Sequence, residues 1–594
     1  MKKIKITTVL AIFLLIGFLG SCSDDMLVEK PPHFITADVL YTNVDGFNAG
    51  INGLYSLVQQ ERSGINYTGG FGKIDLCSQI YLAGTDNVAT GTSGGLTTLL
   101  GDWTKSTSTD PNLDKIFLWL YKAVSASNQI ISRAENPDVD WGVGENNKEK
   151  IVAEARAIRA WAYRHLTYLW GDVPLMTEEV SGENIQTDLV REKVSVIRKL
   201  MINDLKYASE NLPWIPEKAG HISRGAVQTY LAETYLAVGK PDSALYWTNE
   251  CINKGPYKLI TSRYGANSDK PGAAFMDMFH PSKTNISDGN TEALWVLQYE
   301  QNVVGGSDNL MRHETTNRYD QVQYCGKKGF LTYTDERGGR GWSRQTLTKK
   351  GLLLYYSSSD SLNKRLDQRG SEYAIRKYFT VGALDDFAGI QNPATKQLWK
   401  AGDTVWLATP TSKKKVTNPG DKFQSGAYNF NLLSDNTSND NNWPYSLKFA
   451  YCDPGFPTTT ESHSDQVFMR LAETVLLRAE AKGRLNNLQG AADDINLLRD
   501  RANAKLVTIS DLGTDLTSFL DYILDERSRE LLLEEQRRYT LLRMGGEKFF
   551  FRRVQEFNKI DKNMTLRDTL FAIPQTVIDA NLNSVMPQNP GFNQ

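Results

Sequence analysis

Two helices joined by a tight turn are predicted in residues 223–255, SRGAVQTYLAETYLAVGKPDSALYWTNECINKG. The Gly-Lys-Pro-Asp turn falls at 239–242, and the small residues Ala232 and Ala244 allow the paired helices to pack closely. A second pair is predicted near the C-terminus, where the turn GRLNN separates two apolar helix faces within 468–502. Helix pairs in two distant parts of the chain favour a mainly α fold.

The first pair resembles a tetratricopeptide unit, whereas the second departs from the strict repeat of about 34 residues. Between these helical blocks, residues 256–463 are rich in Gly, Asn, Tyr, Trp and Pro, with short alternating runs such as EALWVLQYE at 292–300. This composition predicts loops with short strands. We therefore expect a single domain over residues 37–594, in which a helical platform (about 37–255 and 464–594) carries a large loop-rich insertion (about 256–463).

Further helices are predicted from apolar periodicity. Residues 44–60 carry apolar side chains at helical spacing. The segment EARAIRAWAYRHLTYLWGDVPL predicts another helix, which ends at Gly171 and cannot resume at Pro174. Residues 61–110 are rich in Gly, Ser and Thr, and are predicted to form irregular loops.

The N-terminus predicts an export signal. Three lysines within residues 1–5 precede an apolar run at 9–19, which is too short to span a bilayer because a spanning helix needs about 20 residues. The sequence Leu-Gly-Ser-Cys ending at Cys22 resembles a bacterial lipobox, in which the cysteine becomes the acylated first residue of the mature protein. A plain secretory signal is the alternative. We predict a signal peptide at 1–21 and a lipidated tether at 22–36.

Composition argues against several classes of function. The net charge is -2 and no basic block occurs, so nucleic acid is not an expected partner. Apart from Cys22, the cysteines are widely spaced and lack zinc-ligand spacing. They are predicted to be unpaired and mostly buried, although one disulfide stays possible. No metal or other cofactor is expected.

Known catalytic motifs are missing from the sequence. The acidic stretch DERSRELLLEEQRRY could supply paired carboxylates for glycoside hydrolysis. However, Asp525 with Arg529 and Glu534 with Arg538 have the i, i+4 spacing of ion pairs on a helix surface. We therefore interpret these carboxylates as structural and expect no enzyme.

Tryptophans in loop-like stretches are the most informative candidate binding residues. Trp103, Trp342, Trp399 and Trp406 lie among Gly, Ser and Thr rather than in helical periodicity. Sugar rings present apolar C–H faces that pack on aromatic faces. For each tryptophan the alternative is that it fixes a loop to the core.

Several stretches together resemble the SusD/RagB family of nutrient-binding surface lipoproteins of Bacteroidetes. The resemblance runs along nearly the whole mature chain, in the same order. It includes EARAIRAWAYRHLTYLWGDVPL (154–175), DLKYASENLP (204–213), SRGAVQTYLAETYL (223–236), NTEALWVLQY (290–299), RLAETVLLRAEA (470–481), INLLRDRA (495–502), ERSRELLLEEQRRYTLLRMG (526–545) and QNPGF (588–592).

This resemblance implies a helical platform of tetratricopeptide-like units that supports a loop-rich binding part. It also implies a lipoprotein on the outer face of the outer membrane, because Asp24 and Asp25 after Cys22 look like the signal for surface exposure. Such a protein would form the lid of a SusC-like TonB-dependent transporter and would deliver oligosaccharides to it without chemical turnover. A peptide ligand and a purely structural scaffold are the other interpretations.

Five residues are candidates for ligand contact by the same resemblance. Asp86, Asn87 and Trp103 lie in or after the stretch LAGTDN, and Tyr319 and Trp342 have roughly the placement of the aromatic arc in starch-binding members.

Overall fold

The computed structural model of the protein describes residues 36–592. The exceptions within that range are 67–72, 75–76, 92–95, 182–184, 267, 322–328, 343, 359, 361–362, 393–395, 407–443 and 559–562. The predicted signal peptide, Cys22 and nearly all of the predicted tether therefore lie outside the described residues.

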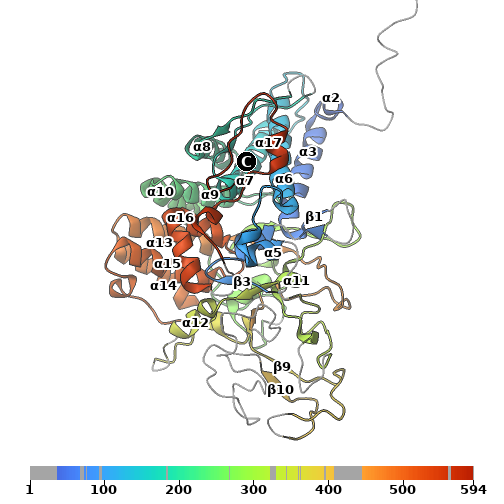
Figure 1. The fold of residues 1–594 in the computed structure, drawn as a ribbon, viewed down its shortest axis with the longest axis vertical. Helices are drawn as coiled ribbons and strands as arrows, with labels where there is room; N and C mark the ends of the chain where they lie inside the picture. Colours follow the sequence, from blue (N-terminus) through green and yellow to red (C-terminus); the bar gives the residue numbers. More distant parts are fainter. Residues whose placement is uncertain are drawn as a thin grey trace, which may run out of the picture.

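Helices dominate the described chain outside its middle third (Figure 1). The α-helices are α2 (Ala37–Leu40), α3 (Val44–Ser63), α4 (Cys77–Leu82), α5 (Leu96–Gly101), α6 (Pro111–Arg133), α7 (Asn147–Trp170), α8 (Val194–Asn211), α9 (Arg224–Ala237), α10 (Pro241–Lys254), α11 (Met311–Thr315), α12 (Lys349–Ser357), α13 (Leu471–Arg484), α14 (Leu488–Arg501), α15 (Leu516–Glu530), α16 (Arg537–Phe557) and α17 (Gln575–Asp579). The 3₁₀-helices are η2 (Trp103–Lys105), η3 (Ala274–Phe279), η4 (Ile286–Asp288), η5 (Tyr319–Gln321), η6 (Gln368–Gly370), η7 (Ile509–Leu512) and η8 (Leu566–Thr569).

Both predicted helix pairs form, as α9–α10 and α13–α14. Pro241 occupies the first turn of α10, where its missing N–H costs nothing. The two pairs also pack on each other, since α10 and α9 contact α13 although more than 200 residues separate them along the chain. Helix α7 ends at Trp170 as predicted, because Gly171 adopts a positive φ of 74° that ends a helix readily.

Short antiparallel strand pairs tie distant parts of the chain together. The pair of β6 and β12 joins the two ends of the loop-rich segment, with Val296 opposite Val467 and Ala293 opposite Arg470. The pairs are β1 (Ile65–Asn66) with β2 (Lys73–Ile74), β3 (Val88–Thr90) with β7 (Gln345–Leu347), β4 (Val173–Pro174) with β5 (Arg191–Glu192), β6 (Ala293–Leu297) with β12 (Gln466–Arg470), β8 (Ile375–Arg376) with β11 (Tyr445–Ser446), and β9 (Tyr378–Thr380) with β10 (Thr404–Trp406).

Residues 61–110 differ from the predicted loops. The described part of this segment contains α4, β3 and α5, and η2 follows Asp102. Helix α4 packs on α16, and Ile80, Tyr81 and Leu82 are buried there. Such short elements are stabilised by tertiary contacts rather than by their own periodicity.

One large apolar core runs through the helical part, and two smaller ones lie mostly in the loop-rich part, one around Phe275 and one around Tyr319. We call the one around Tyr319 the smaller core. In Figure 1 the loop-rich part, with β9 and β10, occupies the opposite end of the longest dimension from α2. The smaller core has its own set of buried side chains, so the loops there pack around a centre of their own. Its members are Tyr319, Phe330, Leu331, Phe379, Val381, Trp399, Val405, Tyr445 and Ala450.

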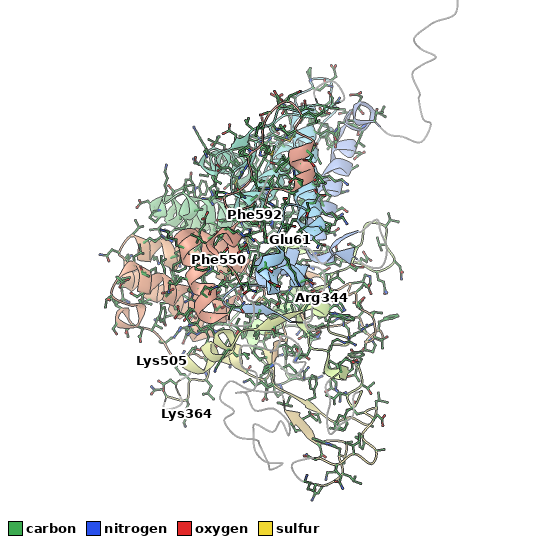
Figure 2. The ribbon with its side chains drawn as sticks, viewed as in Figure 1. Glu61, Arg344, Lys364, Lys505, Phe550 and Phe592 are labelled. Atoms are coloured by element: carbon green, nitrogen blue, oxygen red, sulfur yellow. The ribbon has the colours of Figure 1, made fainter. Side chains whose placement is uncertain are left out.

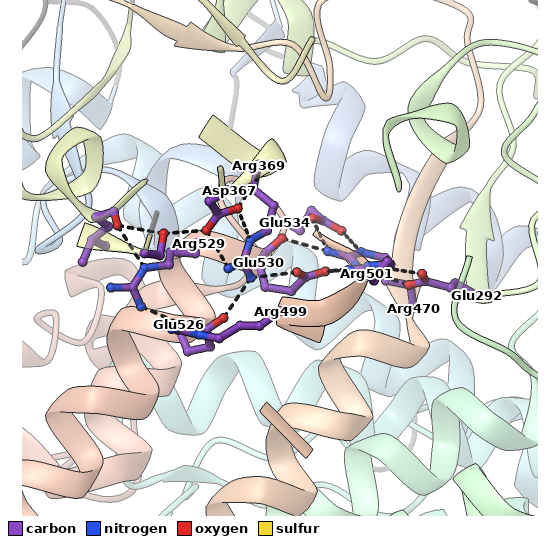
Figure 3. Close-up of polar contacts among 12 residues, drawn as sticks. Glu292, Asp367, Arg369, Arg470, Arg499, Arg501, Glu526, Arg529, Glu530 and Glu534 are labelled. Carbon is purple, nitrogen blue, oxygen red and sulfur yellow. Dashed lines mark hydrogen bonds and ion pairs between the residues drawn. The ribbon is translucent and has the colours of Figure 1, made fainter. Parts of the chain in front are cut away.

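A network of buried charges, which we call the ionic joint, connects the loop-rich part to the helices (Figure 3). Glu530 at the end of α15 is its centre. Its carboxylate oxygens lie 2.7 Å from Nη1 of Arg470 and 3.1 Å from Nη1 of Arg369, and Arg501 also contacts it. Arg369 belongs to η6 in the loop-rich part, whereas Arg501 belongs to α14. The other members are Glu292, Asp367, Lys448, Arg499, Glu526, Arg529 and Glu534.

Charge pairing in the ionic joint keeps the carboxylates of Glu530 and Glu534 ionised. Burial alone would raise the pKa of Glu530, but Arg501, Arg470 and Arg369 outweigh burial and hold this pKa well below its usual value. In the same way, Arg470 and Lys448 hold the pKa of Glu534 below its usual value in spite of burial.

The predicted ion pairs of α15 and α16 have the right role but the wrong partners. Helix α15 ends at Glu530 and α16 begins at Arg537, so Glu534 lies between helices and contacts Arg470 at 2.6 Å. Arg538 donates instead to the backbone oxygens of Asp568 and Thr569. Arg529 contacts Glu526 of its own helix at 3.0 Å, and Asp525 contacts Lys350 and Arg553. Pairing is structural, as expected, but apart from Arg529 with Glu526 it joins distant parts of the chain.

Candidate functional site

Asp86, the first predicted ligand contact, is fully buried between two arginines of α16. Its Oδ1 accepts a hydrogen bond of 2.8 Å from Nε of Arg537, and its Oδ2 lies 2.7 Å from Nη2 of Arg553. Burial would raise the pKa of Asp86, but Arg537 and Arg553 hold it below its usual value. The carboxylate therefore connects the turn before β3 to α16.

Asn87 and Trp103 are also buried. Oδ1 of Asn87 accepts a hydrogen bond of 3.0 Å from Ser528. Trp103 has no exposed surface; its ring stacks on Phe571 at 6.1 Å and lies 5.3 Å from the guanidinium of Arg538. For Trp103 the structure favours the alternative that the sequence left open, in which the tryptophan fixes a loop to the core.

Tyr319 lies inside the smaller core, and only Trp342 among the five predicted residues is partly exposed. The hydroxyl of Tyr319 donates to the backbone oxygen of Gly339 at 3.0 Å, and its ring meets Tyr333 edge to face at 5.2 Å. Side chains that are at most 4% exposed offer almost no surface to a ligand in this conformation. We therefore reassign Asp86, Asn87, Trp103 and Tyr319 to structural roles.

Trp342 is surrounded by arginines. The guanidinium carbons of Arg318, Arg340 and Arg344 lie 4.6, 5.4 and 5.8 Å from the centre of its ring, within cation–π range. The side chains of Arg318 and Arg344 are 24% and 20% exposed. We call Arg318, Tyr333, Arg340, Trp342 and Arg344 the arginine–tryptophan patch.

A glycine-rich turn positions this patch. Gly339 adopts a positive φ of 71°, and a Cβ on Gly341 would lie 2.3 Å from the backbone oxygen of Thr316. The chain can therefore pass this close only as glycine. The amide of Trp342 then donates to the backbone oxygen of His313 at 2.8 Å. Buried Arg312 stabilises the turn by donating a hydrogen bond of 2.6 Å to the backbone oxygen of Arg340.

Two carboxylates, one buried and one partly exposed, contact side chains of the patch. Glu314 of α11 is fully buried and accepts hydrogen bonds from Nε2 of Gln79 at 2.6 Å and from Nη1 of Arg344 at 3.0 Å. Asp320 accepts a hydrogen bond from the hydroxyl of Tyr333 and lies 3.7 Å from Arg318. Burial, followed by Asp320, raises the pKa of Tyr333, so this hydroxyl stays protonated at neutral pH.

The patch lies where the helical and loop-rich parts meet. Trp342 and Arg344 directly precede β7, which pairs with β3 so that Thr90 faces Gln345. Figure 2 shows Arg344 at this level of the molecule, between the helices and the loops. The geometry offers an aromatic face and hydrogen-bond donors, which suits binding better than catalysis.

The arginines of the patch, which sequence reasoning missed, do carry a signal in the sequence. Arg340, Trp342 and Arg344 alternate within RGGRGWSR. In an extended chain, residues i and i+2 lie on the same side, so this spacing predicts that the three side chains share one face. Arg318 and Tyr333 come from other turns and carried no local signal.

Within the described residues, no group of His, Cys, Asp and Glu could hold a metal ion, and no helix is long and apolar enough to cross a membrane. Cys251 and Cys452 are free thiols and are buried, as predicted. Among the concavities of the described part of the chain, one of about 160 Å³, one of about 280 Å³ and one of about 360 Å³ lie outside the patch. The largest is bounded by the loop 215–221 and by β6, and the most apolar by α6 and α17.

Together, the fold and the patch define a helical-repeat protein that presents a loop-built aromatic surface. Comparison with known proteins gives this class a family. A model of the SusD family matches residues 291–592, about half of the chain, and a model described as starch-binding associating with outer membrane matches residues 83–236. The chain belongs to the SusD/RagB family.

The chain is similar to its relatives over more than nine tenths of its length, at low identity. A SusD-like protein of Formosa agariphila is 24% identical over 553 residues, which are 91% of this chain and 90% of the relative. A solved SusD homologue from Bacteroides thetaiotaomicron covers 94% of this chain and 98% of its own at 18% identity, with a TM-score of 0.65. A laminarin-binding SusD-like protein covers 93% and 100% at 19% identity, with a TM-score of 0.62.

Proposed function

We propose that the protein is a cell-surface lipoprotein that captures oligosaccharides and delivers them to a SusC-like TonB-dependent transporter of the outer membrane. The single observation that carries this proposal is Trp342, a partly exposed residue whose ring lies within cation–π range of three arginines. Family membership supports it, since one matching model is described as starch-binding and a structural neighbour binds laminarin.

Binding without turnover is the role we propose for the site. The carboxylates near Trp342 are engaged, because Glu314 is fully buried and Asp320 accepts from Tyr333. A hydrolase needs a carboxyl group that can exchange protons with its substrate. The patch instead offers an aromatic face for the C–H side of a sugar ring and N–H donors for its oxygens.

Replacing Trp342 with alanine tests the site. We expect glycan affinity, measured by isothermal titration with oligosaccharides selected on a glycan array, to fall by about 30-fold or more, because an aromatic anchor contributes about 2 kcal/mol. Tyr246→Ala is the control, since Tyr246 is an exposed aromatic of α10 that meets Trp247 edge to face and lies outside the patch. Equal affinity in wild type and Trp342→Ala would refute the site. Peptides that co-purify, identified by mass spectrometry, would replace the glycan with a peptide.

Replacing Cys22 with alanine tests the proposed lipid anchor and the location at the cell surface. Acyl chains contribute about 0.8 kcal/mol per buried methylene, and several chains anchor a protein stably. We expect the wild type in the outer-membrane fraction and accessible to protease added to intact cells. The Cys22→Ala variant should leave that fraction, and pull-down of the transporter from detergent-solubilised membranes then reports the partner. Retention of the variant on the membrane would contradict the lipid anchor.

A further inference from the structure

We propose that the glycan bound at the arginine–tryptophan patch is acidic, with carboxylate or sulfate groups on its sugar rings. This inference rests on the proposed function, because it names the ligand class of the same site. It is carried by the charge around Trp342 rather than by the aromatic ring itself.

Arg340 is the central observation. Both of its backbone polar groups are hydrogen-bonded: its N–H donates to the oxygen of Pro457 at 2.7 Å, and its C=O accepts from Arg312. Its guanidinium lies over Trp342, and no described residue forms an ion pair or a hydrogen bond with it. The backbone at Arg340 is therefore fixed, whereas the guanidinium N–H groups of this partly exposed residue have no protein acceptor in the described structure.

Two further guanidiniums are held near the same ring, which raises the local positive charge. Arg344 contacts Glu314 and Arg318 contacts Asp320, so two of the three arginines have a carboxylate partner. Like charges brought close together repel one another. In the ionic joint, by contrast, each arginine contacts at least one carboxylate, and Arg470 contacts Glu292, Glu530 and Glu534. An anion bound at the patch would supply the carboxylate that Arg340 lacks.

The hydrogen-bonding chemistry of the patch points the same way. Arginine carries N–H donors only, in a planar fork that matches the paired oxygens of a carboxylate or sulfate. Glu314 and Asp320 already accept hydrogen bonds from Gln79 and Tyr333. A neutral sugar hydroxyl needs acceptors as well as donors, whereas an acidic sugar needs donors beside an aromatic face.

Acidic ligands and their neutral counterparts separate the contribution of charge to affinity from that of the sugar rings. Oligogalacturonate is compared with its methyl ester, and chondroitin sulfate with desulfated, carboxyl-reduced chondroitin, by isothermal titration in about 0.05 M and about 0.5 M NaCl. Alginate and neutral glucans complete the panel. We expect the preferred acidic ligand to bind about tenfold or more tightly than its neutral counterpart at low salt, and to lose that advantage at high salt.

Arg340→Gln is the decisive variant. It should weaken the acidic ligand by about tenfold and the neutral counterpart by less than about twofold, and Arg340→Lys should restore part of the loss because it keeps the charge. Arg552→Gln is the matched control: its guanidinium also lies over an aromatic ring, that of Phe549 at 4.9 Å, but outside the patch. Circular dichroism verifies that each variant is folded.

The outcomes distinguish this inference from the proposed function. Equal binding of acidic and neutral ligands, or no effect of Arg340→Gln, overturns the acidic-glycan inference while Trp342-dependent binding upholds the site. Binding of poly-glutamate as tightly as the acidic glycan overturns it in favour of an acidic peptide. Absence of binding to every glycan in the panel overturns both. Comparison of the carboxylate-bearing ligands with the sulfate-bearing ligands identifies which acidic group the patch binds.

Discussion

Replacement of Glu530 by alanine is expected to lower the free energy of unfolding by about 3–5 kcal/mol, because removal of one partner leaves buried charges without compensation. Three arginines converge on this carboxylate inside the protein, and Nζ of Lys448 donates to its backbone oxygen at 2.6 Å. Urea unfolding followed by tryptophan fluorescence gives the free energy directly.

Glu556→Ala is the matched control for Glu530→Ala. Glu556 forms an i, i+4 pair of 3.5 Å with Arg552, and both side chains are about half exposed. Exposed pairs of this kind contribute roughly 0–1 kcal/mol. If Glu530→Ala loses no more stability than Glu556→Ala, the ionic joint does not hold the two parts of the protein together as we infer.

Replacement of Asp86 by alanine should also lower the free energy of unfolding by about 3–5 kcal/mol, since Arg537 and Arg553 would lose the carboxylate that both contact. Folded Asp86→Ala protein should still bind glycan with the affinity of the wild type. Thermal unfolding and titration on the same preparation measure the two effects.

This result would separate a structural from a ligand-binding role for Asp86. Asp138→Ala serves as the control, because Asp138 is exposed and lies in a turn away from both sites. A stable Asp86→Ala variant with weakened glycan binding would restore Asp86 to the site and contradict our reassignment.

Local periodicity predicted the helices well. Helices α3, α9, α10, α13 and α14 occur close to the expected positions because each has an apolar face of helical spacing, and Gly171 ends α7 where expected. The elements of 61–110 were missed because β3 is fixed by pairing with β7, more than 250 residues away. No local pattern encodes such a partner.

The candidate site was predictable only in part. Trp342 was identified because it lies in a loop-like stretch and has roughly the placement of the aromatic arc in starch-binding members, but the loop argument also selected Trp103, which is buried against Phe571. Sequence shows that a tryptophan lies in a loop, whereas exposure depends on what packs over that loop. Likewise, Glu534 and Arg538 had helical spacing, yet the helix ends before Glu534 and their partners come from elsewhere.

The ionic joint has a consequence for how this protein can vary. A single substitution at Glu530 or Arg470 leaves an uncompensated buried charge, so those positions can change only in concert with their partners. Arg318, Arg340 and Arg344 are partly exposed and lie beside a turn whose conformation depends on glycine and on Arg312. Single substitutions at the patch arginines can therefore change ligand preference independently of one another. The residues of the ionic joint, in contrast, can change only together.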